Sequence, residues 1–209
     1  MNRMLRRFAD ICRRILVICA IPVAMLVVPE VAHSHTAPFG ITGYPILILH
    51  PFIVLDHALC IVAAALLGGQ QESLGFPRSL ASLLAGQAAG FTYLVLVPSS
   101  AFEPFLPIGF AAVLGLLVAL APRLNRYLAA GAVFAAGFAV GLNTYPEDGL
   151  PLVLAMTLGG LMLGSTVLFT LVGWPVSRLK KDWQRIGVRI AGSWLAASVC
   201  LVLALAFRP

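Results

Sequence analysis

Charged side chains are scarce in this sequence. Asp, Glu, Lys and Arg make up only 11% of its 209 residues, whereas a soluble domain carries about a quarter. Hydrophobic residues make up 60%, and the mean hydropathy is +0.98. No polar stretch is long enough to form a soluble domain, so the sequence predicts an integral membrane protein.

Motifs of the common enzyme classes are also missing. The chain has no Gly-x-Ser-x-Gly elbow, no His-Glu-x-x-His zinc motif, no Cys-x-x-Cys-His haem site and no phosphate-binding glycine loop. No lysine lies within a predicted membrane helix, which excludes a retinal Schiff base. The cysteines lie in apolar runs without Cys-x-x-Cys spacing, unlike a disulfide framework or a zinc finger. We therefore expect a protein that is not an enzyme.

The N-terminal 34 residues have the order of a secretory signal peptide. A basic region precedes a 14-residue apolar core, ILVICAIPVAMLVV, and an exit with small residues. Cleavage after Ser34 would leave Ala32 and Ser34 at the two positions that prefer small side chains. The alternative is an uncleaved first membrane helix. We expect residues 1–34 to be the signal peptide or extra helix, and residues 35–209 to form one transmembrane domain.

Six further apolar segments predict an all-α transmembrane bundle of six mature helices. Proline or glycine marks nearly every junction between them, as expected where helices stop. The basic connector at 174–188 is expected to form a short helix on the inner leaflet. The six predicted segments are 44–67, 79–97, 105–121, 127–142, 150–172 and 188–207.

The basic residues predict how the bundle is oriented. With the N-terminus in the cytoplasm and alternating helices, 13 of the 14 Lys and Arg residues fall on the cytoplasmic side, and only Arg208 falls outside. On this orientation both mature termini are periplasmic, and the expected location is the bacterial inner membrane. The net charge of +6 is then explained by the orientation of the helices in the membrane. We therefore expect the lipid bilayer as a partner and do not expect binding to nucleic acid. A membrane protein complex or a homo-oligomer is a further candidate partner.

Small residues predict close helix packing. Three helices carry glycine pairs at four-residue spacing, which lets helix backbones approach closely in lipid. Seven polar residues are expected to form ordinary interhelical hydrogen bonds. They are Gln87, Thr92 and Tyr93 on the predicted second helix, and Thr157, Ser165, Thr166 and Thr170 on the predicted fifth helix. The glycine pairs are Gly86 and Gly90, Gly137 and Gly141, and Gly160 and Gly164.

The stretch ILHPFIVLDHALC, residues 48–60, places His50, Asp56 and His57 within an apolar segment. If the segment is one helix, Asp56 and His57 lie near the bilayer midplane, where ionisable groups are costly and normally face a polar interior. His50 and His57 would stand on one face, about 10 Å apart along the axis. Pro51 either kinks this helix or begins it.

These side chains predict a cation site. Imidazole suits nickel, cobalt, copper or zinc, and a carboxylate adds compensating charge. One helix does not supply a full coordination sphere, and the nearest further candidates are His33 and His35. After cleavage, His35 would offer an amine and an imidazole together. The structural alternatives are a helix cap at His50 and a polar bridge formed by Asp56 and His57.

The segment HPFIVLDHALCIVAAALLGGQ, residues 50–70, resembles the first mature helix of the HupE/UreJ family. These are small bacterial membrane proteins encoded with hydrogenase or urease genes. The His-Pro…Asp-His pattern of that family is matched by His50, Pro51, Asp56 and His57. The signal-like start ending in AHSH and the closing segment RIAGSWLAASVCLVLALAF, residues 189–207, are also similar to the family.

The resemblance implies a permease for a divalent transition metal, with nickel first and cobalt second. No firm cofactor is expected, and a bound Ni²⁺, Co²⁺, Cu²⁺ or Zn²⁺ ion would be cargo or a structural ion. The alternative it implies is a non-transporting accessory subunit of a larger membrane complex. Val54 and Cys60 replace a glycine and a methionine of the family pattern. A later histidine motif appears here as VGLNTYPEDG, residues 140–149, in which Asn143, Glu147 and Asp148 offer harder oxygen ligands.

Overall fold

The computed structural model describes residues 44–97, 105–144 and 150–206. The chain divides into two compact units, Met1–Gly40 and Ile41–Pro209, and every described residue belongs to the second. The predicted signal peptide at 1–34, with His33, and the neighbouring His35 lie outside the described residues. The boundary of the transmembrane domain at residue 35 therefore stays a prediction.

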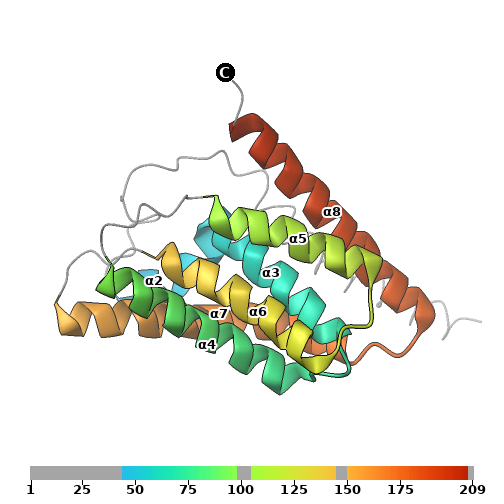
Figure 1. The fold of residues 1–209 in the computed structure, drawn as a ribbon, viewed down its shortest axis with the longest axis horizontal. Coiled ribbons are helices and arrows are strands. Elements are labelled where there is room, and N and C mark those ends of the chain that lie inside the picture. Colours follow the sequence, from blue (N-terminus) through green and yellow to red (C-terminus); the bar gives the residue numbers. More distant parts are fainter. Residues whose placement is uncertain (1–43, 98–104, 145–149, 207–209) are drawn as a thin grey trace, which may run out of the picture. The chain divides into compact units, whose positions relative to one another are not determined.

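The described part of the chain is entirely helical, which confirms the predicted fold class (Figure 1). It contains seven helices and no strand. The helices are α2 (Tyr44–Ile53), α3 (Leu55–Gln70), α4 (Phe76–Leu96), α5 (Leu106–Leu120), α6 (Arg126–Leu142), α7 (Pro151–Ser177) and α8 (Asp182–Ala206).

Three of these helices, α4, α7 and α8, are long and apolar enough to cross a membrane. The pair α2 and α3 would make a fourth span if counted as one, although a bend of 75° separates its two parts. Helices α5 and α6 are apolar but shorter, with 15 and 17 residues. The six predicted segments thus correspond to helices, and the first of them is broken in two.

Local sequence explains where several helices begin. Proline occupies the first turn of α4, α5 and α7. Backbone N–H groups in the first turn have no acceptor within the helix, so proline, which lacks this group, loses no hydrogen bond there. The side-chain oxygen of Asn125 accepts hydrogen bonds from the backbone N–H groups of Tyr127 and Leu128, at 3.0 and 2.9 Å, and caps α6.

The prediction of a separate helix at 174–188 is wrong. Helix α7 continues through Pro175 to Ser177, and α8 begins at Asp182, so only four residues connect them. Pro175 lies in the last turn of α7, where a missing N–H removes only one hydrogen bond of the helix. Trp174 and Trp183 are half-exposed residues near the ends of long helices.

Helices α4 and α6 pack through their glycines, side by side in Figure 1. A methyl group on Gly86 or Gly90 of α4 would overlap the carbonyl oxygens of Phe134 or Phe138 on α6. The contact is reciprocal, because Gly137 and Gly141 of α6 face the carbonyls of α4 in the same way. The matched order along both helices makes them parallel neighbours and confirms the packing role predicted for these glycines.

The third glycine pair joins α2 to α7. A methyl group on Gly160 would meet Leu47, and one on Gly164 would overlap the carbonyl oxygen of Ile48. A similar close approach joins α5 to α8, where Gly115 faces Gly192 and the residues after it. Helix α3 lies in the centre of this arrangement and contacts α4, α5, α6, α7 and α8.

The connectors at the basic end of the bundle are tied together by Gln71. Its side-chain amide donates to the carbonyl of Pro122 at 3.0 Å, and its oxygen accepts from the N–H of Leu124 at 3.1 Å. Glu72 forms an ion pair with Arg185 at the start of α8. The connectors 71–75, 121–125 and 178–181 therefore lie at one end of the bundle, and they carry or adjoin most of the described basic residues.

Candidate metal-binding site

The site lies where α2 ends and α3 begins. Val54 separates the two helices in an extended conformation, with φ −80° and ψ 108°. Its N–H donates to the carbonyl of His50 at 3.0 Å, and its carbonyl accepts from the N–H of Ala58 at 2.9 Å. Val54 therefore closes the last turn of α2 and opens the first turn of α3 while the chain changes direction.

This break corrects the expectation of a continuous helix over 44–67. Pro51 lies inside α2 and lacks an N–H, so the carbonyl of Leu47 loses its helical partner and lies against Gly160 of α7. The bend itself falls three residues after Pro51. It follows from different packing, because α2 lies along the first half of α7 whereas α3 occupies the centre of the bundle.

The bend brings His50 and His57 together. Their rings lie edge to face, with centroids 5.1 Å apart and planes at 66°. A continuous helix would have separated them by about 10 Å along its axis. The predicted arrangement of the two histidines on one straight helix face is therefore wrong, and the bend places their rings in contact instead.

His57 is almost completely buried, with 1% of its surface exposed. Neither Nδ1 nor Nε2 has a hydrogen-bond partner among the described residues. A neutral imidazole carries one donor and one acceptor, and burying both without partners costs free energy. Such a group calls for an explanation, and a water or an ion at the ring would supply one.

Asp56 is half-buried in the first turn of α3. Its Oδ1 accepts the backbone N–H of His57 at 2.9 Å, a group that has no partner within the helix. A carboxylate is also favoured there by the positive end of the helix dipole. Asp56 thus stabilises the start of α3 in addition to placing negative charge beside the histidine pair.

The remaining predicted ligands are not brought to this site by the described structure. His33, His35, Glu147 and Asp148 lie outside the described residues. Within 44–97, 105–144 and 150–206, no three or more His, Cys, Asp and Glu side chains are grouped closely enough to hold a metal ion. The site is therefore an imidazole pair with a neighbouring carboxylate and not a preformed three-ligand cage.

A second polar group is buried deeper in the bundle. The Nε2 amide of Gln87 on α4 donates to the hydroxyl of Ser165 on α7 at 2.7 Å, and both residues are fully buried. This confirms the predicted interhelical hydrogen bonding for these two residues. The prediction is wrong for three others, because the hydroxyls of Thr92, Thr157 and Thr166 donate to carbonyls of their own helices. The Oε1 atom of Gln87 has no partner among the described residues, which sequence analysis did not anticipate.

Packing places Gln87 near the level of the histidines. The thiol of Cys60, one turn after His57, donates to the carbonyl of Ala136 on α6 at 3.7 Å. A methyl group on the next residue, Gly137, would lie 3.1 Å from the backbone nitrogen of Gln87. Cys60 and Gln87 thus contact the same turn of α6. His57 lies one turn before Cys60, so the incompletely partnered side chains of His57 and Gln87 are buried at similar levels of the bundle.

These features define an integral membrane protein made of a helical bundle, with polar groups concentrated at the broken first span. Residues 23–203 match the family described as HupE / UreJ protein, and the match covers most of the chain. The chain belongs to this family. No curated protein and no solved structure matches it.

Proposed function

We propose that the protein is a permease for a divalent transition metal ion, nickel first and cobalt second. The observation that supports this most is the imidazole of His57. It is buried, both its ring nitrogens are without partners among the described residues, and its ring lies 5.1 Å from that of His50. Family membership favours the same role. Neutral imidazole nitrogen is a good ligand for both ions.

The incomplete ligand set suits a transported ion better than a resident one. A transport site has to bind the ion strongly enough to admit it and weakly enough to release it. Two imidazoles and the carboxylate of Asp56 would hold the ion at the break, and the amide oxygen of Gln87 would offer a further contact at a similar level of the bundle. The sequence contains no nucleotide-binding motif, so transport on this proposal is passive, coupled to a gradient or driven by a partner.

We further propose the bacterial inner membrane as the location. The end of the bundle that carries the connectors 71–75, 121–125 and 178–181 would face the cytoplasm, as the positive-inside rule predicts. Both termini of the mature chain would then be periplasmic. On this orientation the ion enters from the end opposite the basic connectors, reaches the α2–α3 break in the interior and moves on toward the basic end.

The test is nickel uptake in nickel-starved cells that express the wild type, His57→Ala or Thr166→Ala at matched levels. Thr166 is a control in the membrane region because its hydroxyl bonds only within its own helix, to the carbonyl of Met162. We expect uptake to fall to background in His57→Ala and to stay unchanged in Thr166→Ala. Equal uptake by His57→Ala and the wild type would rule out transport through this site.

The second candidate is a non-transporting accessory subunit of a membrane complex. Two observations favour it. The described residues contain no group of three or more His, Cys, Asp and Glu side chains that could hold a metal ion, and residues 140–149 contain no histidine. This function predicts a membrane protein that copurifies in constant ratio and cells whose nickel uptake does not depend on the chain. Nickel uptake without such a partner would exclude it.

A further inference from the structure

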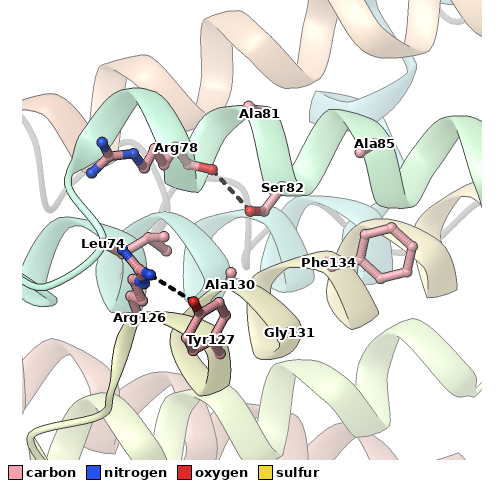
Figure 2. Close-up of a pocket in the computed structure, with 10 residues that line it drawn as sticks. All are labelled: Leu74, Arg78, Ala81, Ser82, Ala85, Arg126, Tyr127, Ala130, Gly131 and Phe134. Atoms are coloured by element: carbon pink, nitrogen blue, oxygen red, sulfur yellow. Dashed lines mark hydrogen bonds between the residues drawn. The ribbon is translucent and has the colours of Figure 1, made fainter.

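A groove with two arginines lies on the outer face of the bundle, at its basic end. It runs between the first turns of α4 and α6 and has a volume of about 680 Å³. Figure 2 shows both guanidinium groups at one end of the groove and Phe134 at the other. Its main features are formed by Arg78, Ser82, Arg126, Tyr127, Gly131 and Phe134.

The polar end of this groove is positively charged. Arg78 and Arg126 are exposed, and no acidic residue lines the groove. Arg126 donates to the hydroxyl of Tyr127 at 2.6 Å and lies 4.7 Å from the centre of that ring, which fixes its position. The guanidinium of Arg78 has no acceptor among the described residues. Both helices also begin here, so their dipoles add positive charge.

The rest of the groove is apolar and open. Its floor is made of Ala81, Ala85, Ala130 and Gly131, and a methyl group added to Gly131 would meet nothing within 4 Å. The groove therefore follows two parallel helices from a charged end into their apolar middle. An anion held at the arginines would have an apolar channel directly beside it.

The geometry points to a binding site for an anionic phospholipid. Its phosphate would lie between Arg78 and Arg126, and one acyl chain would lie over Gly131 toward Phe134. Basic pockets between membrane helices bind anionic lipid headgroups by the same chemistry. A soluble anion would use the arginines but not the apolar floor, so the combination selects a lipid. This inference does not depend on the proposed metal transport.

The experiment is native mass spectrometry of the full chain in detergent, with phosphatidylglycerol and phosphatidylcholine as probes. The variant Arg78→Gln/Arg126→Gln removes both charges. Its matched control, Lys180→Gln/Lys181→Gln, removes two charges from the same end of the bundle but outside the groove. We expect the arginine variant to bind phosphatidylglycerol about thirtyfold more weakly, and the lysine control to bind it nearly as well as the wild type.

A second variant tests the apolar part of the groove. Gly131→Leu would fill the floor, whereas Gly109→Leu adds the same side chain to α5 at a position equally free of neighbours. We expect only Gly131→Leu to reduce phosphatidylglycerol binding. Equal losses in the arginine and lysine variants, equal binding of phosphatidylcholine, or full competition by inorganic phosphate would each overturn the inference. Thermal unfolding of all variants establishes that they are folded.

Discussion

The side-chain amide of Gln87 donates to the hydroxyl of Ser165, and its oxygen has no partner within the described part of the bundle. The bond fixes the direction of the amide group, because Nε2 must point toward α7. The oxygen then remains available on the other side. The Nε2 group of Gln87 therefore contributes to stability, whereas its Oε1 atom is the group proposed to contact the transported ion.

Gln87→Leu is expected to leave the thermal stability in detergent nearly unchanged while lowering nickel uptake. The substitution removes a buried group that is only partly satisfied, and Ser165 can bond to a carbonyl of its own helix instead. Ser165→Ala should do the reverse and cost about 1–3 kcal/mol of unfolding free energy, since it leaves the amide unpaired. Full uptake by Gln87→Leu at wild-type expression would exclude Gln87 from the path.

Gly137→Ala is expected to destabilise the protein by about 1–3 kcal/mol, because the added methyl group would overlap the carbonyl of Leu83 and force α4 and α6 apart. Gly131→Ala on the same helix is the matched control. Its methyl group meets no neighbour, so a gain of up to about 1 kcal/mol from higher helix propensity is expected. Thermal unfolding of both variants measures the difference, and similar effects would contradict the packing described.

Gln71→Leu is expected to cost about 1–3 kcal/mol of unfolding free energy. Gln71 is buried, and the substitution breaks its bonds to Pro122 and Leu124, leaving two backbone groups without partners. The adjacent Glu72→Gln should change the stability by less than about 0.5 kcal/mol, because its pair with Arg185 is exposed to solvent. A larger effect at Glu72 than at Gln71 would show that the ion pair holds the connectors.

The mature protein is expected to begin at His35. Cleavage after Ser34 follows from the basic region, the short apolar core and the small residues at the exit. Intact-mass measurement of protein purified from its membrane should therefore give the mass of residues 35–209. The mass of the full chain would instead establish an uncleaved first helix and would remove the free amine from His35.

Much of the fold could be predicted from the sequence. Apolar length and terminal prolines located the helices to within a few residues at most ends, as for α6, predicted at 127–142 and found at Arg126–Leu142. The glycine pairs also identified close contacts correctly, since four-residue spacing places both glycines on one face. These features depend on neighbouring residues in one helix, which a sequence displays directly.

The arrangement of the site could be predicted only in part. The sequence placed His50 and His57 on one helix face about 10 Å apart. It did not reveal the bend at Val54, because that bend depends on how α2 packs against α7 and how α3 fits among the other helices. The pairing of Gln87 with Ser165 was hidden for the same reason. Two polar residues 78 positions apart become partners only once the order of the helices around α3 is known.

The glycine contacts divide the bundle into locked pairs. Three pairs of helices approach closely through glycine: α4 with α6, α2 with α7, and α5 with α8. This close contact hinders sliding of one helix past the other within each pair, whereas α3 packs among all three pairs. These contacts favour a conformational change in which each pair moves as a rigid body against α3. His50 belongs to the pair of α2 and α7 and His57 to α3, so on the proposed transport function such a movement would also separate the two imidazoles and release the ion.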